Sequence, residues 1–131
     1  MKQTGTNNIR KEPFSFDEIM SVKTVTGFDT HYFKNSNGLK IVYYTFLPKK
    51  PMAKLIFIHG GGAYSKLGYL PLAKQLQEKY NIQTMLIDLV GHGKSEGQRG
   101  DCISPISLYR DISQLAEITN IDNKPMYIAG H

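Results

Sequence analysis

Residues 54–62 read Lys-Leu-Ile-Phe-Ile-His-Gly-Gly-Gly, and this stretch decides the fold that the sequence predicts. The run 54–58 lacks the alternation of a half-exposed strand, which is typical of a strand covered on both faces in a parallel sheet. Glycines follow shortly after the run, so the strand ends in a loop with wide backbone freedom. In sheets of this kind, ligands bind at the carboxyl ends of the strands, where such a loop would lie.

Downstream of this strand, helical and strand patterns alternate. Residues 69–80 and 105–119 have helical spacing, and residues 84–87 and 126–129 predict two further buried strands. The side chains expected on the buried faces are Leu72, Ala73, Leu76 and Tyr80 in the first helix and Leu108, Ile112, Leu115 and Ile118 in the second. The alternation predicts an α/β fold with a parallel sheet and crossover helices.

Upstream of residue 54, the pattern is that of a β-hairpin. Residues 30–34 and 39–47 predict strands, and Asn-Ser-Asn-Gly at 35–38 predicts the turn between them. A short helix is expected over residues 14–20, within a lead-in that spans residues 1–27. The hairpin should contribute antiparallel strands to the sheet.

Composition narrows the class of protein. The chain has 131 residues, of which 40% are hydrophobic and 21% charged, which is enough for one domain with a buried core. The net charge of +5 is spread over scattered Lys and Arg residues, which argues against a nucleic-acid-binding protein. Cys102 is the single cysteine, so no intramolecular disulfide can form, and we interpret it as a half-buried filler.

The cellular location and the bound groups are predicted from the lack of a signal segment, of a membrane-length apolar run and of a metal-ligand cluster in the sequence. The N-terminus is polar, and the apolar runs fall far short of the roughly 20 residues that cross a membrane. We therefore expect a soluble, cytoplasmic protein without a transmembrane segment, for which peripheral contact with lipid stays open. No His, Cys, Asp or Glu cluster has metal-ligand spacing, so neither a metal nor a cofactor is expected.

Three segments resemble the monoacylglycerol-lipase and lysophospholipase branch of the α/β-hydrolases, a group similar to the S33 serine aminopeptidases. They are Ile-His-Gly-Gly-Gly at 58–62, Asp-Leu-Val-Gly-His-Gly-Lys-Ser-Glu-Gly-Gln-Arg at 88–99, and Ile-Ala-Gly-His at 128–131. The second segment matches the long pattern D-x-x-G-H-G-x-S-E-G. The resemblance covers residues 28–131 and implies the N-terminal half of a hydrolase domain.

The resemblance also implies roles for the loop residues. The N–H of Gly61 would be an oxyanion donor, because such a site needs backbone amides that no side chain obstructs. His59 would be a hydrogen-bonded structural residue rather than a proton shuttle. Neither His92 nor Ser95 takes a catalytic role. The residues assigned as scaffold of the two loops are His59, Gly60, Gly62, Asp88, Gly91, His92 and Gly93.

Gly130 and His131 correspond to the start of the nucleophile elbow, the strained strand-to-helix turn that exposes the reactive serine. By the resemblance the serine would follow His131, and the acid and base of the triad would come later still. No catalytic residue is therefore assigned within residues 1–131, and the chain alone is expected to be inactive. His131 is the residue beside the nucleophile, and the resemblance does not make it the general base.

Two other interpretations of the glycine-rich loop are disfavoured. Residues 93–97 read Gly-Lys-Ser-Glu-Gly, which has the form G-x-S-x-G, and later carboxylates and His131 follow in triad order. However, Ser95 lies seven residues beyond Asp88 and does not open a helix, as an elbow serine should. A P-loop would need a glycine where Asp88 stands, and a carboxylate there would repel phosphate.

The leading functional hypothesis is a truncated serine hydrolase. The resemblance implies that the parent enzyme cleaves carboxylic esters, such as those of monoacylglycerols or lysophospholipids, through an acyl-serine. The alternative is a non-catalytic binding or regulatory half that pairs with a second chain through the open edge of strand 126–129. For the isolated chain we expect exposed apolar surface and a tendency to aggregate.

Overall fold

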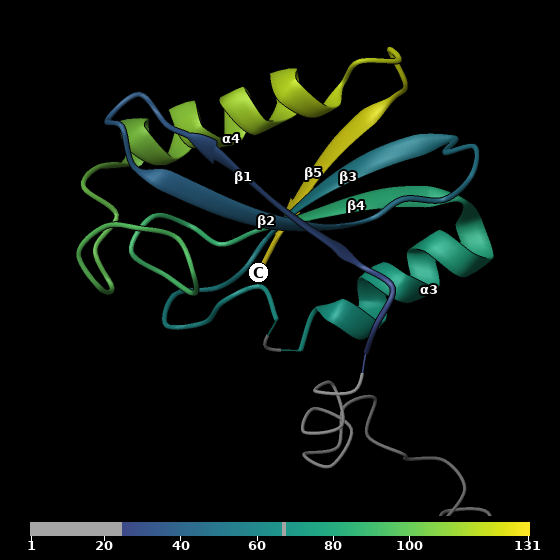
Figure 1. The fold of residues 1–131 in the computed structure, drawn as a ribbon, viewed down its shortest axis with the longest axis horizontal. Helices are drawn as coiled ribbons and strands as arrows, with labels where there is room; N and C mark the ends of the chain where they lie inside the picture. Colours follow the sequence, from purple (N-terminus) through teal and green to yellow (C-terminus); the bar gives the residue numbers. More distant parts are fainter. Residues whose placement is uncertain (1–24, 67) are drawn as a thin grey trace, which may run out of the picture.

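The computed structural model describes residues 25–66 and 68–131, and within them five strands form one sheet in the order β1-β2-β4-β3-β5 (Figure 1). The short helix expected over residues 14–20 and most of the expected lead-in lie outside the described residues. The elements are β1 (Asp29–Lys34), β2 (Lys40–Phe46), β3 (Ala53–Ile58), α3 (Leu70–Tyr80), β4 (Ile82–Ile87), α4 (Pro105–Thr119) and β5 (Met126–Gly130).

The sheet is antiparallel on one side and parallel on the other. β2 pairs antiparallel with both β1 and β4, whereas β3 runs parallel to both β4 and β5. The chain leaves β3 through α3 to reach β4, then crosses back over β3 through α4 to reach β5. Because such crossovers are right-handed, the two helices lie on opposite faces of the sheet (Figure 1). The predicted α/β arrangement of a hairpin followed by parallel strands is confirmed.

Each face of the sheet carries its own core. On the α4 side, Leu115 is fully buried in a cluster that includes Ile56 and Met85. On the α3 side, Ala73 is fully buried beside Leu86. The two sets alternate along β4 because successive strand residues point to opposite faces. Fully burying one such aliphatic side chain contributes about 1.5–3 kcal/mol, so both faces add to the stability of the domain.

Strand pairing extends β4 beyond its predicted start. The prediction began this strand at Thr84, but the parallel ladder with β3 begins at Ile82 and includes Gln83. Gln83 is buried, and its Nε2 donates to Thr45 Oγ1 at 3.1 Å. A polar residue that reads as loop in the sequence is thus held in the sheet by a partner on β2.

The buried faces of both helices are narrower than the sequence spacing predicts. Leu72 and Tyr80 in α3 are 41% and 60% exposed, and Ile118 in α4 is 42% exposed, so their predicted burial is wrong. In α3 only Leu70 and Ala73 are buried, so a thin stripe of the helix faces the sheet. Ile118 lines an open groove at the end of α4 instead. Among the described helices, none is long and apolar enough to cross a bilayer.

β5 lies at the edge of the sheet, as the open-edge hypothesis expects. Within the described residues it pairs with β3 alone. Tyr127 and Ile128 are 61% and 59% exposed, so the prediction of a buried third strand is wrong. The apolar composition of this segment predicted a strand, but burial depends on a neighbour that composition does not supply.

Candidate functional site

The segments that follow β3, β4 and β5 all leave the sheet at the carboxyl ends of these strands, which lie side by side because the strands are parallel. Ile58 is in register with both Ile87 and Gly130. The N–H of His131 donates to Ile58 O at 3.1 Å, which continues the ladder past the end of β5. A Cβ added to Gly60 would lie 3.3 Å from His131 Nδ1. The structure therefore brings the first and third sequence motifs into direct contact.

The loop after β3 presents Gly61 without obstruction. The N–H of Ala63 donates to Gly60 O at 3.1 Å and closes a turn, within which Gly62 has a φ of +75°. No atom lies within 4 Å of the position that a Gly61 Cβ would take. Among the described residues, the Gly61 amide has no hydrogen-bond acceptor. A backbone donor that is both free and approachable is what an oxyanion site requires.

His59 is a buried structural link between the loops after β3 and β4. Its Nδ1 lies 2.9 Å from Gly60 O, and its Nε2 accepts the N–H of Leu89 at 3.1 Å. These contacts require a neutral ring that carries its proton on Nδ1. Burial, together with the His92 ring at 5.2 Å between centroids, lowers the pKa of His59, although the Gly60 hydrogen bond acts in the opposite sense. A ring held in this way has no free nitrogen for proton transfer.

Asp88 is a fully buried carboxylate that organises both loops. Its oxygens accept the N–H of Ser65 at 2.8 Å, the N–H of Lys94 at 3.0 Å and the hydroxyl of Tyr44 at 3.2 Å. Burial, followed by the nearby Asp88 charge, raises the pKa of Tyr44, which therefore stays a donor. A Cβ on Gly93 would lie 2.2 Å from Asp88 Oδ2, so only glycine lets the loop approach this closely.

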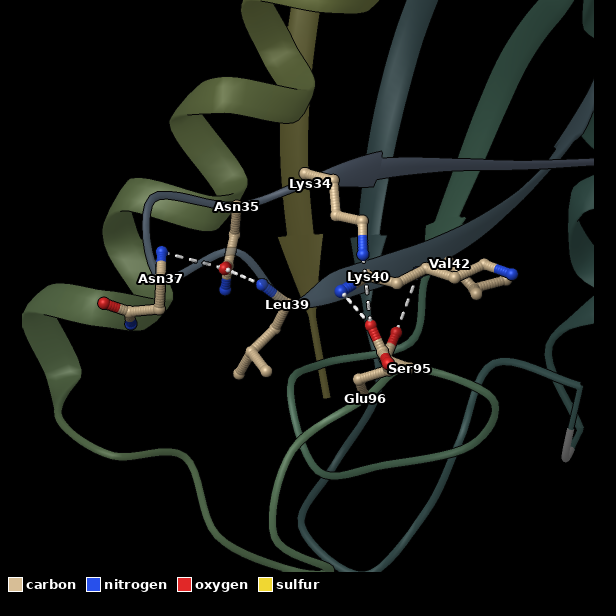
Figure 2. A network of polar contacts seen from close by, with 8 residues as sticks. All are labelled: Lys34, Asn35, Asn37, Leu39, Lys40, Val42, Ser95 and Glu96. Atoms are coloured by element: carbon tan, nitrogen blue, oxygen red, sulfur yellow. Dashed lines mark hydrogen bonds and ion pairs between the residues drawn. The ribbon is translucent and has the colours of Figure 1, made fainter.

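Ser95 connects β2 to the loop after β4 and is 2% exposed. Its Oγ donates to Asp88 O at 2.6 Å and accepts the N–H of Val42 at 2.8 Å. Next to it, Glu96 Oε1 accepts the N–H of Lys40 at 2.7 Å, and Figure 2 shows this contact beside the one between Ser95 and Val42. The hydroxyl of Ser95 is thus committed to the main chain, and the G-x-S-x-G sequence at 93–97 is a structural clasp in this fold.

Comparison of the sequence with models of protein families shows which family the chain belongs to. The model of the family described as serine aminopeptidase, S33, matches residues 49–131. The chain belongs to that S33 family. No curated protein matches its sequence.

Solved structures similar to this S33 family member include α/β-hydrolases and an esterase. The α/β-hydrolase GrgF from Penicillium sp. sh18 is 22% identical, with a TM-score of 0.71 over 80% of this chain and 37% of its own. A carboxyl esterase from Bacillus coagulans is 25% identical (TM-score 0.68, 82% and 37%). Monoglyceride lipase from Saccharomyces cerevisiae is 20% identical (TM-score 0.68, 82% and 36%). The chain spans just over a third of the length of each of these proteins.

Sequence reasoning missed Arg99 as an organiser of the S33 loop after β4. Its guanidinium donates to Gly93 O at 2.9 Å, to Gly97 O at 3.3 Å and to Ser95 O. His92 lies in the same loop, half-buried, with Nδ1 2.9 Å from Val90 O. The sequence shows an arginine two residues after the G-x-S-x-G sequence, but it does not show that the loop carbonyls point inward.

Tyr69 is a second residue of the site that sequence reasoning missed. Its hydroxyl lies 2.9 Å from His131 Nδ1, and its ring packs on Phe57 with centroids 4.9 Å apart. The helical spacing of residues 69–80 predicted only that α3 begins near this position. Since Tyr69 and His131 are 62 residues apart in sequence, nothing in the local pattern indicates the contact.

Proposed function

We propose that this chain provides the oxyanion-donor part of a serine hydrolase that cleaves carboxylic esters through an acyl-serine. The contact between Gly60 and His131 carries the proposal, because it sets the glycine loop beside the end of β5. The Gly61 amide would stabilise the tetrahedral oxyanion, and the nucleophile would be a serine directly after His131. Membership of the S33 family supports this assignment.

The geometry of the serines supports a second part of the proposal, namely that residues 1–131 hydrolyse no ester alone. At the carboxyl edge of the sheet, Ser65 and Ser95 are both buried. Ser65 Oγ donates to Ile87 O at 2.6 Å, just as Ser95 Oγ donates to Asp88 O. A hydroxyl held in this way lacks both a general base and access to substrate.

For the substrate we propose a small-molecule or lipid ester, with monoacylglycerols and lysophospholipids as the leading classes. The D-x-x-G-H-G-x-S-E-G pattern at residues 88–99 motivates this choice, and one similar structure is a monoglyceride lipase. Peptide p-nitroanilides would test the competing aminopeptidase activity. A preference for these amides over p-nitrophenyl esters would contradict the ester proposal.

Active-site labelling tests the hydrolase directly. The reading frame that encodes these residues, expressed with the codons that follow His131, should turn over p-nitrophenyl esters. It should also take one equivalent of a fluorophosphonate at the serine after His131, while residues 1–131 alone should do neither. Another residue type at that position, or a folded but unlabelled serine, contradicts the proposal. Labelling of Ser95 in the 131-residue chain would instead make that serine the nucleophile.

The exposed edge of β5 favours a second candidate function, that of a non-catalytic half that binds another chain. Tyr127 and Ile128 offer apolar surface on both faces of an edge whose outer main-chain groups are free in the described structure. A partner strand could pair with that edge and cover both side chains. Co-purification with a partner of about 130–150 residues, an ordinary domain size, would support this function. A chain that purifies alone as a monomer would count against it.

A further inference from the structure

Tyr69 lies where the loop after β3, residues 59–69, meets α3. We call this segment the oxyanion loop, and the Tyr69 side chain points across it toward the end of β5. It occupies the N-cap position of α3, but its side chain makes no cap hydrogen bond. Instead the hydroxyl lies 2.9 Å from His131 Nδ1, with the two rings edge to face and their centroids 6.2 Å apart. The hydroxyl is therefore directed at the strand end rather than at its own helix.

The phenol ring is held firmly enough to fix that hydroxyl in place. It lies 4.9 Å from the Phe57 ring between centroids and packs against the core cluster under α3. The main chain of its partner is held as well, because the N–H of His131 donates to Ile58 O, whereas the His131 side chain is exposed. A ring packed on the core, next to a residue whose main chain is fixed by the sheet, loses less side-chain entropy on forming a hydrogen bond than two free side chains would.

The imidazole of His131 lies directly against the oxyanion loop. A Cβ on Gly60 would be 3.3 Å from His131 Nδ1 and 3.4 Å from its carbonyl oxygen, so a side chain at this position would require the histidine to shift slightly. The Tyr69 hydroxyl contacts the same Nδ1 atom. The spacing between the glycine loop and the end of β5 therefore depends on one imidazole and on the hydroxyl that holds it.

We infer that Tyr69 is a positioning residue of the hydrolase site: its hydroxyl holds the His131 imidazole against Gly60 and so sets the distance from the Gly61 amide to the residue after His131. The inference rests on the proposed function for its catalytic meaning, while the contact itself belongs to the described chain. Oxyanion donors act only at about 2.7–3.1 Å, and a misplacement of ~1 Å costs about 100-fold in rate, so this spacing matters for catalysis.

Tyr69→Phe tests the contact in the 131-residue chain, because it removes the hydroxyl and keeps the ring on Phe57. Tyr64→Phe is the matched control, since Tyr64 lies in the same loop, is 42% exposed and has no hydroxyl contact among the described residues. We expect Tyr69→Phe to shift the His131 ring resonances in NMR spectra. We also expect exchange of the Ala63 amide, which closes the loop turn, to become about fivefold faster, the factor for losing one typical hydrogen bond. Tyr64→Phe should change neither.

Unchanged His131 resonances in a folded Tyr69→Phe variant would overturn the inference. If that variant does not fold, the unsubstituted chain gives the answer. Cross-relaxation between the Tyr69 and His131 ring protons supports the contact, and its absence overturns it.

Catalysis is tested separately in the longer reading frame. Tyr69→Phe should lower kcat about tenfold with little change in KM, because the substrate still binds while the oxyanion donor is misplaced. A fall in kcat that is fully explained by a loss of thermal stability would overturn the positioning role. An unchanged kcat would overturn it too. If the unsubstituted protein hydrolyses no ester, the proposed function fails, whereas the NMR result still decides whether Tyr69 holds His131.

Discussion

Gly91 adopts a φ of +76°, and a Cβ built on it would lie 2.4 Å from the carbonyl oxygens of both Gln98 and Asp101. Gly100, in the same loop, has a similar φ of +78°, yet no atom lies within 4 Å of its Cβ position. At the residue scale these two glycines separate two reasons for having no side chain. Gly100 needs only the left-handed backbone conformation. Gly91 needs that conformation and also the space that a side chain would fill.

Gly91→Ala should therefore be much more destabilising than Gly100→Ala. Both variants carry the cost of a left-handed residue, about 1–2 kcal/mol. Gly91→Ala adds an overpacking cost of roughly 1–3 kcal/mol, because its neighbours are main-chain atoms that cannot turn aside. Urea unfolding of the three proteins measures the difference. Equal unfolding midpoints for the two variants would show that the close contact around Gly91 does not exist in solution.

At the scale of elements, the loop after β4 and strand β2 form one clasp. Glu96 bonds to Lys40 through main chain and side chain, and Lys34 lies 3.6 Å from the same carboxylate (Figure 2). Ser95 and Asp88 continue the contact along β2, because Asp88 N–H donates to Val42 O. The loop is thereby part of the sheet rather than a free connection.

Ser95→Ala should destabilise the domain by about 1–3 kcal/mol, because the buried N–H of Val42 loses its acceptor. Ser113→Ala is the control, since Ser113 is half-buried in α4 and has no side-chain hydrogen bond among the described residues. Thermal unfolding compares the two. If both variants unfold like the parent chain, Ser95 is free of the main chain, and its role as a nucleophile would have to be reconsidered.

The C-terminal end of α4 is held by a buried cation. Lys54 is 2% exposed, and its Nζ contacts Asp122 Oδ1 at 2.5 Å and the carbonyl oxygen of Thr119, the last residue of the helix. An ammonium at this end interacts favourably with the helix dipole. The Lys54 hydrogen bond lowers the pKa of Asp122, so the native state favours the ionised carboxylate.

Asp122→Asn should lower the thermal midpoint at neutral pH, because the buried ammonium loses its counter-ion. The carboxylate contributes stability above its unfolded-state pKa of 3.8, and this contribution is lost as pH falls through its lower folded pKa. The midpoints of variant and parent should therefore converge in acid. Adding Lys54→Met to the variant should recover stability, since it removes the unpaired charge. A constant difference at every pH would contradict the ion pair.

At the scale of the whole molecule, the described fold leaves apolar side chains exposed along the β5 edge of the sheet. Tyr127 and Ile128 on β5 are more than half exposed, and Ile121, just before that strand, is 88% exposed. An edge strand with exposed apolar side chains is a template for pairing with another chain. The open edge and the exposed side chains together predict self-association of the isolated chain.

Ile128→Lys should reduce that association without lowering stability, because the side chain is already 59% exposed and a charge on an edge strand discourages pairing. Leu47→Lys is the control, since Leu47 is 55% exposed but lies just past β2. Sedimentation velocity should show a smaller average mass for Ile128→Lys alone. If the parent chain is already a monomer, or both variants behave alike, the β5 edge is not the associating surface.

Local pattern determined the elements of this protein and the glycines of its site. The continuous apolar run 54–58 and the helical periodicity of residues 105–119 involve only neighbours a few positions away, and the conformations open to Gly61 depend on that residue alone. These features were predictable because local sterics and side-chain spacing are properties of the chain itself.

Only the tertiary structure decided which side chains are buried and which polar groups meet. Tyr69 reaches His131 across 62 positions, and Tyr44 reaches Asp88 across 44. Strand order also decided that β5 lies at an edge, so that Ile128, which is apolar by composition, is exposed. A long-range contact forms only when two surfaces fold against each other, and spacing along the chain carries no information about that meeting.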